Sequence, residues 1–511
     1  MKRALLSVSD KTNIVSLAKF LQEKNIEIIS TGGTAKVLQE NNITITPIQE
    51  VTGNPEAFGG RMKTISFEIG SALLFRRENK DDQADAKNLN ITPIDFVICN
   101  LYPFQAISEQ TQDLATRIEN IDIGGPTMIR AAAKNYKSVT CLTSPEQYEF
   151  FQNNFESLDE EYRFKMAMEA FEMTAEYDQF IVNTLHKKTL PIASTQKKEL
   201  RYGENPHQKA WLVPWKNTDQ DRCLAQAKQW QGKELSYNNM IDADAAWKTT
   251  SDLNQIFPSQ SIVTIVKHAN PCGVCSASDQ VSAIKKAWEC DPISSFGSII
   301  SFNQKVELQT AQFLLNRFIE IIIAPSFSHE AKDLLKQKKN LRLLEVPNKP
   351  SESHEYVIKS INGALLIQEE DEQNGYEFIT VTDKKLPEKF DQLKKFGMIV
   401  NKYLKSNSIL LAGLSKKDMV IAGAGMGQPN RLDSLKMLAG PRAKALNFAM
   451  NEVLLISDAF FPFADSIECA HELGIKFLIQ PGGSVKDQEV IKACNQFEIA
   501  MEFTNTRHFR H

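Results

Sequence analysis

The sequence is poor in cysteine, has no long apolar run and carries no large excess of either charge. Eight cysteines in 511 residues are too few for a disulfide framework. No apolar run approaches the roughly 20 residues that span a bilayer, and the first ten residues lack a signal-peptide cleavage pattern. Lys and Arg number 59 against 63 Asp and Glu, a net charge of −4, which argues against nucleic-acid coats and membrane-surface proteins. We therefore expect a cytoplasmic protein without membrane or nucleic-acid partners.

The remaining composition is that of a globular protein. Hydrophobic residues make up 42% and charged residues 24%, which excludes collagen, disorder and coiled coil. At about 150 residues per domain the length predicts roughly three units.

The first 150 residues alternate apolar strands with helical periods. Strands are predicted at Arg3–Val8, Ile26–Ser30 and Phe96–Asn100, and helices at Lys11–Glu23 and Ala35–Glu40. This alternation predicts an α/β fold with a parallel sheet covered on both faces, and ligands at the carboxyl ends of the strands.

A long helix is predicted over Tyr162–His186, followed by a polar, lysine-rich stretch broken by Pro191. The expected organisation is therefore a first domain over 1–190, a linker over 191–200 and a second domain over 201–511. In the second domain, strands are predicted at Ile262–Val266, Ile321–Ala324 and Leu478–Gln480, and the charged stretch Glu330–Glu372 is expected to form a solvated helical surface.

Three loops of the first domain combine glycine, hydroxyl groups and cations. They are Ser7–Thr12, Ser30–Thr34 and Gly59–Thr64. Exposed backbone N–H groups at a helix start and an Arg–Lys pair suit a phosphate, although each loop alone is also compatible with an ordinary strand–helix turn. Neither a Walker loop nor a dinucleotide fingerprint follows the first strand, so nucleoside triphosphates and dinucleotides are disfavoured.

Further candidate groups follow the third strand. Tyr102 precedes Pro103 and can donate to an oxyanion, or fill an aromatic core. Asp122 stands just before a glycine pair, where it is either a turn residue or a general base. Lys134 is expected on the following helix, where a solvated lysine is the simpler interpretation.

The second domain offers a lysine–histidine pair after a buried strand. Lys267 and His268 combine a cation with a group that titrates near neutrality, as acid–base chemistry requires. Cys272 and Cys275 match half of a zinc-deaminase signature, but no His-x-Glu occurs anywhere in the chain, so zinc is disfavoured. Polar or aromatic stretches at Arg201–Gln208, Ser406–Ser408, Asp458–Asp465 and Arg507–His511 complete the candidates.

Taken together, eleven motifs resemble one family, the bifunctional purine-biosynthesis proteins that join AICAR (phosphoribosylaminoimidazolecarboxamide) transformylase to IMP cyclohydrolase. In chain order they are SVSDKT, STGGTA, GGRMKT, CNLYPF, IDIGGPTMIRAAAKN, LRYGENPHQ, VKHANPCG, DPISSFG, SNS, SDAFFPF and TNTRHF. The resemblance covers the chain from Leu5 to His511.

The resemblance implies a methylglyoxal-synthase-like α/β domain followed by two cytidine-deaminase-like α/β subdomains that have lost zinc. It implies formyl transfer from 10-formyltetrahydrofolate, a cosubstrate, to AICAR, followed by dehydrative ring closure of formyl-AICAR to IMP. It also implies a homodimer with transformylase sites built across the subunit interface, and no metal.

Residue roles follow from the same resemblance. For formyl transfer it implies His268 as the base and Lys267 as the charge-stabilising cation; for ring closure it implies catalytic Lys63, Tyr102, Asp122 and Lys134. Residues implied to bind substrate in the first domain are Ser9, Lys11, Thr31, Gly33, Thr34, Arg61, Thr64 and Gly124. In the second domain they are Arg201, Tyr202, His207, Asn239, Asn407, Arg507 and Phe509, with Phe460 and Asp465 near the folate.

The chain departs from the family at two places. Ile65-Ser66-Phe67 stand where Leu-His-Pro is usual, so the loop beyond Lys63 is expected to run differently, and Asn430 stands where Ser is common. Two alternatives stay open. In one, the first domain is an effector-binding module and the protein is a transformylase only; in the other, the protein is a zinc deaminase.

Overall fold

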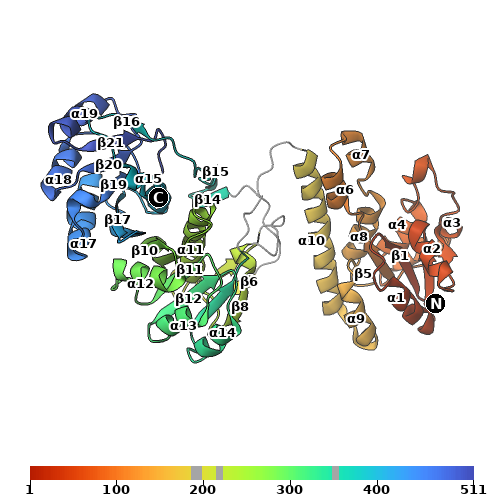
Figure 1. Ribbon diagram of the computed structural model, residues 1–511. Coiled ribbons are helices and arrows are strands. Elements are labelled where there is room, and N and C mark those ends of the chain that lie inside the picture. The colour runs from red at the N-terminus through yellow and green to blue at the C-terminus, as the bar shows by residue number, and fades with distance from the viewer. Residues whose placement is uncertain (186–197, 215–222, 348–355) are drawn as a thin grey trace. The chain divides into compact units, whose positions relative to one another are not determined.

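The computed structural model describes residues 1–185, 198–214, 223–347 and 356–511. The chain divides into two compact units, Met1–Leu190 and Pro191–His511 (Figure 1). Of the expected linker 191–200, residues 191–197 lie outside the described part of the chain. Within the described part, no helix combines the length and the apolar character needed to cross a membrane.

The first unit contains a five-stranded parallel sheet in the order β3-β2-β1-β4-β5. The strands are β1 Arg3–Val8, β2 Glu27–Ser30, β3 Thr46–Pro47, β4 Phe96–Asn100 and β5 Thr140–Leu142. The direction of winding reverses between β1 and β4, so the loops after these two strands separate and leave room for a ligand at the carboxyl edge. The predicted parallel α/β fold is confirmed.

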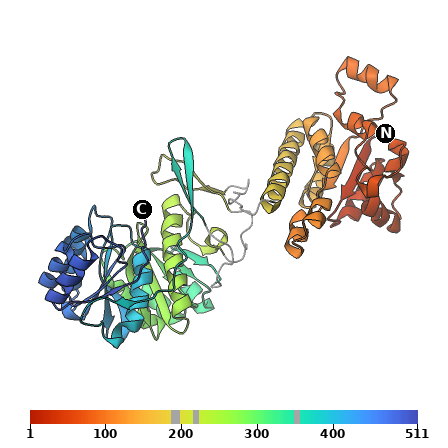
Figure 2. The ribbon, with the colours of Figure 1, turned by 90° about the horizontal axis from the view of Figure 1, so that it is seen from above.

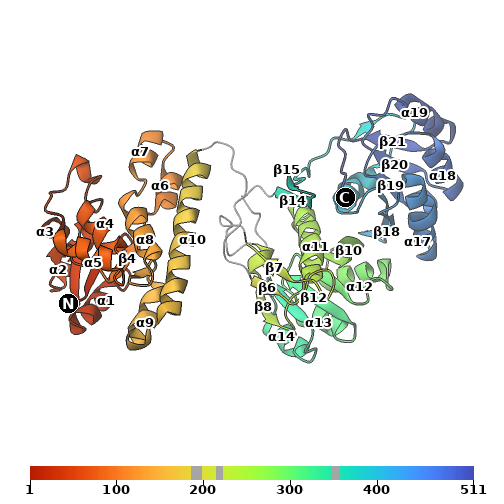
Figure 3. The same cartoon turned by 180° about the vertical axis from the view of Figure 1, so that it is seen from behind.

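Helices cover both faces of this sheet. The pattern of α1 shows why: Ile14, Leu17, Ala18 and Leu21 recur at helical spacing and are all buried against the sheet. On the other face α8 and α10 lie side by side (Figures 1 and 3). The helices are α1 Ile14–Glu23, α2 Gly32–Glu40, α3 Ile48–Thr52, α4 Phe67–Leu74, α5 Lys80–Asn88, α6 Phe104–Gln110, α7 Leu114–Glu119, α8 Gly124–Lys134, α9 Glu146–Asn153 and α10 Glu160–Leu185.

The second unit is built on one sheet of 12 strands, in the order β16-β21-β20-β19-β17-β18-β10-β9-β11-β12-β13-β8. The strands are β8 Lys228–Gln231, β9 Ser261–Lys267, β10 Asn270–Ala277, β11 Ser298–Phe302, β12 Ile319–Ala324, β13 Arg342–Glu345, β16 Ile379–Thr380, β17 Ile409–Ser415, β18 Asp418–Gly425, β19 Leu454–Ser457, β20 Phe477–Gln480 and β21 Ala500–Phe503.

This sheet is a repeat of one arrangement. In residues 228–345 the strands β10-β9-β11-β12-β13-β8 pair antiparallel, antiparallel, parallel, parallel and antiparallel, and residues 379–503 repeat the same sequence of pairings in β18-β17-β19-β20-β21-β16. The halves meet where β10 pairs antiparallel with β18. We call residues 228–345 the first repeat and 379–503 the second; they match the expectation of two related α/β subdomains.

The helices repeat in step with the strands. The first repeat has α11 Tyr237–Ile256, α12 Gln280–Cys290, α13 Leu308–Leu315 and α14 His329–Leu335. The second has α15 Asp391–Lys402, α16 Arg431–Asp433 continued by a π-helix Ser434–Ala439 and α17 Gly440–Ala445, then α18 Asp465–Leu473 and α19 Asp487–Gln496.

The expectation of a helical surface over Glu330–Glu372 is wrong for most of its length. The stretch begins inside α14, but β13 is a largely buried strand of the sheet, and β14 Tyr356–Ile361 and β15 Ala364–Glu369 form a hairpin (teal in Figure 2). Charge misled the prediction because Arg342 is buried and donates to the carbonyl groups of Lys233 and Glu234. A second short hairpin joins β6 Lys198–Leu200 to β7 Ala210–Leu212.

Candidate active sites

In the first unit, the loops after β1 and β2 are held against each other and against β4. The Asn100 side chain accepts the N–H groups of Ser9, at 2.6 Å, and Asp10, at 2.9 Å. The Thr34 hydroxyl exchanges hydrogen bonds of 3.0 Å with the backbone of Val8. A methyl group on Gly33 would lie 3.8 Å from the Lys11 ammonium. Two of the three predicted anion loops therefore adjoin at the carboxyl edge of the sheet.

The second loop forms the first turn of α2. This helix begins at Gly32, three residues before the predicted start at Ala35, so its first N–H groups are free of intrahelical partners. The Thr31 hydroxyl is buried and has no hydrogen-bond partner among the described residues. A phosphate would satisfy both kinds of donor.

The third loop reaches the second loop and the start of α8. A Cβ atom on Gly32 would lie 3.8 Å from the Lys63 ammonium, and one on Gly124 would lie 2.5 Å from the Thr64 hydroxyl oxygen. Lys63 is paired with Glu56 at 2.8 Å, and the exposed Arg61 is paired with Glu119 of α7. A substrate would therefore have to displace Glu56 from Lys63 and Glu119 from Arg61.

Asp122 lies directly before α8 and is fixed on several sides. Its carboxylate accepts the Gly125 N–H at 2.8 Å and the Tyr102 backbone N–H, while its own N–H donates to the Tyr177 hydroxyl of α10 at 2.8 Å. Burial raises the pKa of Asp122, and the two N–H donors oppose that rise only in part. A carboxylate so placed has the raised proton affinity of a general base.

The structure brings Tyr102 into this cluster and leaves Lys134 outside it. The Tyr102 backbone contacts Asp122 and its ring is 56% exposed, available to a ligand. Lys134 is the last residue of α8, ten residues after Gly124. At 1.5 Å per residue, its α-carbon lies about 15 Å from that of Gly124.

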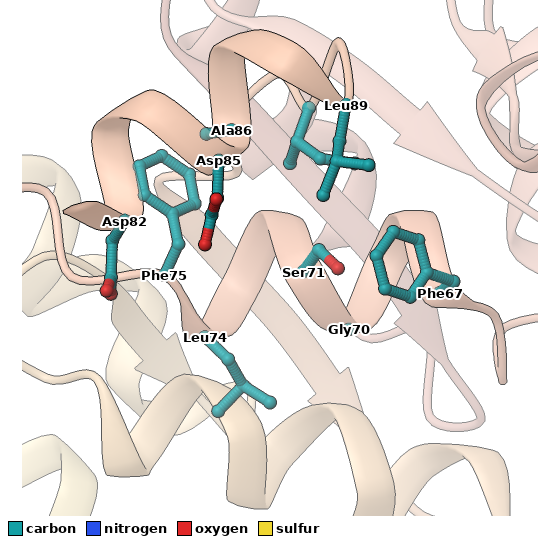
Figure 4. A pocket seen from close by; sticks show the side chains of 10 residues that line it. Phe67, Gly70, Ser71, Leu74, Phe75, Asp82, Asp85, Ala86 and Leu89 are labelled. Atoms are coloured by element: carbon teal, nitrogen blue, oxygen red, sulfur yellow. The ribbon is translucent and has the colours of Figure 1, made fainter.

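The departure at Ile65-Ser66-Phe67 preserves the start of α4. Ser66 is the N-cap residue, and its hydroxyl accepts the Ile69 N–H at 3.1 Å. Phe67 also lies at a pocket on this surface. Together with Leu74 of α4 and Leu89 beyond α5 it lines a pocket of about 600 Å³ between the two helices, with Asp85 at its wall (Figure 4).

In the second unit, the turn between β9 and β10 carries the lysine–histidine pair. The Lys267 ammonium donates to the carbonyl groups of Gly297, at 2.7 Å, and Phe296, at 3.2 Å, while His268 is exposed. Lysine has three N–H donors, so the two carbonyl groups orient the cation and leave a donor for a substrate. The exposed rings of Phe296 and Phe318 lie 5.1 Å apart beside it.

The start of α11 brings further predicted residues together. Backbone hydrogen bonds tie Arg201 to Leu235 and Tyr202 to Tyr237. The Arg201 guanidinium donates to the Tyr202 hydroxyl at 2.6 Å, and the Asn239 amide donates to the Glu320 carboxylate at 2.9 Å. Burial lowers the pKa of the neighbouring Arg342; the Glu320 charge opposes this effect and the Arg201 charge adds to it. Polar and charged groups of both signs thus adjoin the turn of Lys267.

The second repeat reaches the same turn through Lys405, two residues before Asn407. The Lys405 N–H donates to the Asn270 side chain at 3.1 Å, which ties the segment before β17 to the β9–β10 turn. The Asn407 amide in turn donates to the carbonyl groups of Gln428 and Pro429. This contact places a residue of the second repeat at the turn that carries Lys267 and His268.

The C-terminal segment joins this site through Asp458. The Asp458 carboxylate accepts the Ser406 hydroxyl at 2.6 Å and the Arg431 guanidinium at 2.8 Å, and its carbonyl accepts the His508 N–H at 2.9 Å. The Arg507 guanidinium lies 4.5 Å from the centre of the Phe509 ring. The predicted residues at the chain end are thus placed beside Asn407.

Three other predicted site residues of this unit, Phe460, Asp465 and His207, have fewer contacts with the residues described above. Phe460 follows Asp458 by two residues and is half-buried, and Asp465 is the exposed first residue of α18. His207 lies exposed in a turn closed by the Gly203 N–H and the Gln208 carbonyl at 2.7 Å.

Cys272 and Cys275 lie together in β10, and burial raises the pKa of both thiols, which opposes the thiolate form that binds zinc. Among the described residues, no group of three His, Cys, Asp or Glu side chains is arranged to hold a metal ion.

Three polar residues with contacts at these sites were not among the sequence candidates: Tyr177, Asp242 and Glu320. The Asp242 carboxylate accepts the N–H of Ala269, in the turn of His268, at 2.6 Å. Asp242 follows Asn239 by three residues, a spacing that places both on one helix face. For Tyr177 and Glu320 the sequence carries no local indication, because their partners are distant in the chain.

The fold and the two clusters define an α/β enzyme with two separate sites, each combining groups for an anionic substrate with acid–base side chains. Comparison with known families agrees. Residues 13–127 match the MGS-like domain, and residues 132–440 match the AICARFT/IMPCHase bienzyme.

Curated relatives named bifunctional purine biosynthesis protein PurH include those of Petrotoga mobilis (44% identical), Bacillus cereus (45%) and Acetivibrio thermocellus (43%), each covering 100% of both chains. A solved structure described as "Crystal structure of ForH" is 31% identical over 36% of this chain and 99% of its own, with a TM-score of 0.33. The chain belongs to the AICARFT/IMPCHase bienzyme family. It is a bifunctional enzyme of purine biosynthesis, with AICAR formyltransferase and IMP cyclohydrolase activities; neither alternative function finds support in these comparisons.

Proposed function

We propose that the first unit closes the purine ring and the second transfers the formyl group from 10-formyltetrahydrofolate. The observation that supports this division is that each unit has its own candidate acid–base group. The first unit has Asp122, held by the N–H groups of Gly125 and Tyr102, and the second has His268 next to the oriented Lys267.

For ring closure, Asp122 takes the proton of the attacking carboxamide nitrogen of formyl-AICAR. A new bond forms between that nitrogen and the formyl carbon, and the formyl oxygen is protonated to a hydroxyl group. The C–O bond then breaks as the former formamide nitrogen loses its proton and forms a double bond to the same carbon, and the hydroxyl leaves as water with the second proton. Lys63 and Tyr102 donate to this oxygen as it gains charge. Lys63 leaves Glu56 to bind this oxygen. The substrate phosphate takes the place of Glu119 beside Arg61 and accepts from the Thr31 hydroxyl and the first N–H groups of α2. Lys134 remains a candidate on the resemblance alone.

For formyl transfer, His268 takes a proton from the AICAR amine as the nitrogen attacks the formyl carbon. The amine is a weak nucleophile because its lone pair is delocalised, so removing its proton during attack lowers the barrier. The Lys267 ammonium, oriented by two carbonyl groups, stabilises the negative charge on the carbon's oxygen. The bond to the folate nitrogen then breaks and that nitrogen regains a proton. No step is assigned to a metal.

The nucleotide is bound by Arg201, Tyr202, His207, Asn239, Asn407, Arg507 and Phe509, and the folate ring lies near Phe460 and Asp465. We further propose a cytoplasmic homodimer whose partner subunit completes the transformylase site. Light scattering of the purified protein tests this assembly: a single monomeric mass at enzyme concentrations that support formyl transfer would overturn it.

The assignment of one reaction to each unit is tested by measuring both reactions in the variant His268→Ala. His268→Ala should lower formyl transfer by at least about 10²-fold, the usual contribution of a general base, and leave ring closure of supplied formyl-AICAR unchanged. Formation of IMP is followed by its absorbance. If formyl transfer survives, the role of His268 is wrong; if both activities fall together, the division between units is wrong.

A further inference from the structure

The turn that carries His268 has a backbone conformation that its residues disfavour. His268 and Ala269 both have positive φ, at 52° and 60°. Two successive left-handed residues form a tight turn that matches the twist of an antiparallel hairpin, and such turns strongly favour Asn and Gly. Lys267 and Asn270 flank the turn as paired residues of β9 and β10. Positive φ is uncommon for any residue with a Cβ atom and less common for Ala than for His, so contacts from outside the turn are expected to hold it.

That support comes from α11, which lies against β9 and β10 (Figure 1). The Asp242 carboxylate of this helix accepts the Ala269 N–H at 2.6 Å and also the backbone N–H of His268. Burial raises the pKa of Asp242, whereas these N–H groups and the nearby charges of His268 and Lys267 lower it. The carboxylate is therefore enclosed and directed at the turn.

We propose that Asp242 is a positioning residue for formyl transfer: its carboxylate holds the left-handed turn that presents Lys267 and His268 to the substrates. The inference rests on the proposed role of His268. Without the carboxylate that accepts the N–H groups of His268 and Ala269, the turn relaxes toward negative φ and the imidazole moves. A displacement of about 1 Å at a reacting group lowers the rate about 10²-fold.

Asp242→Ala tests this directly, with ring closure by the same protein as an internal measure of folding. We expect kcat for formyl transfer to fall by at least about 30-fold, with KM for AICAR changed by less than about threefold. Asp242→Asn keeps one acceptor oxygen and should retain more activity than Asp242→Ala. The matched control is Asp244→Ala on the same helix, whose carboxylate pairs with Lys248 at 3.5 Å; its kcat should stay within about twofold of wild type.

A second variant separates positioning from general stabilisation of the fold. Glycine adopts positive φ without steric cost, so adding Ala269→Gly to Asp242→Ala should restore kcat at least about fivefold. A merely structural role of Asp242 would not be rescued at the turn. Unchanged kcat in Asp242→Ala, or a loss that Ala269→Gly does not reduce, would overturn the inference.

His268→Ala, measured in parallel, separates this failure from that of the proposed function. If His268→Ala is inactive while Asp242→Ala is fully active, only the positioning role is wrong. If His268→Ala transfers the formyl group normally, both proposals are wrong.

Discussion

The hydroxyl of Thr64 and the α-carbon of Gly124 are in such close contact that a methyl group on Gly124 would lie 2.5 Å from the Thr64 oxygen. This contact joins the third anion loop to the start of α8, two elements separated by some sixty residues of chain. The contact leaves no space for a side chain before Gly125 unless Thr64 moves, and Thr64 is itself buried.

Gly124→Ala should therefore damage ring closure selectively. Overpacking at a buried contact costs about 1–3 kcal/mol, and a cost taken up by displacing the Thr64 loop lowers the rate of IMP formation by about tenfold or more. The control is Gly70→Ala in α4, where an added methyl group meets nothing within 4 Å; it should leave the rate unchanged. Wild-type ring closure by Gly124→Ala would show that this contact does not shape the site.

On the acid side of its pH profile, kcat/KM for ring closure should begin to fall at a higher pH than an exposed aspartate would cause. Burial raises the pKa of Asp122 above the ordinary 3.8, so the catalytic carboxylate takes up a proton, and kcat/KM falls, at a higher pH than for an exposed aspartate. This fall is measured with supplied formyl-AICAR. Asp122→Asn should lower ring closure by about 10²–10⁴-fold and spare formyl transfer. A profile that stays flat down to the pKa of a free aspartate would contradict this assignment.

Tyr177→Phe should slow ring closure without disturbing the packing of α10. The change removes the acceptor of the Asp122 N–H, and a buried N–H without a partner costs about 1–3 kcal/mol, while the ring still packs 6.3 Å from Phe104. Tyr162→Phe on the same helix is the control, because the Tyr162 hydroxyl is buried without a hydrogen-bond partner among the described residues. The prediction is wrong if the two variants have equal kcat for ring closure and equal melting temperatures.

The sequence was most informative where function and fold depend on short stretches of chain. Strands β1 and β4 begin and end at the predicted residues because each is a continuous apolar run inside a parallel sheet. The three loops predicted to bind an anion could be picked out because each follows a strand or precedes a helix. The two departures from the family pattern also have a local explanation. Ser66 and Asn430 are both N-cap residues, and the side chain of each accepts a backbone N–H.

What the sequence could not supply depends on pairing between distant segments. The outer strands β8 and β16 are short and polar, so their place in the sheet is set by their neighbours rather than by their own pattern. Asp242 and Tyr177 act on groups 27 and 55 residues away. The repeat of residues 228–345 in 379–503 is likewise a property of strand order and direction.

The C-terminal segment is held in place by a contact between His508 and Asp371. The imidazole of His508, only 2% exposed, lies 2.5 Å from the Asp371 carboxylate, and the Asp371 carbonyl accepts the buried Lys402 ammonium at 3.0 Å. Burial acts to raise the pKa of Asp371, but the hydrogen bond and charge of His508 outweigh it and hold this pKa below its ordinary value. A depressed folded-state pKa means that the contact stabilises the fold above about pH 4, the unfolded value. That stabilisation is lost as the pH falls through the folded-state pKa.

Asp371→Asn should accordingly loosen the segment that presents Arg507 and Phe509. Because these residues are proposed to bind the nucleotide, we expect KM for AICAR to rise about tenfold, the cost of weakening a hydrogen bond to a charged group. Ring closure should be unaffected. Asp383→Asn, at an exposed aspartate of the same unit, should leave KM unchanged. An unchanged KM in Asp371→Asn would mean that the backbone hydrogen bonds of His508 to Asp458 and of Ser406 to Arg510 hold the chain end without the contact between His508 and Asp371.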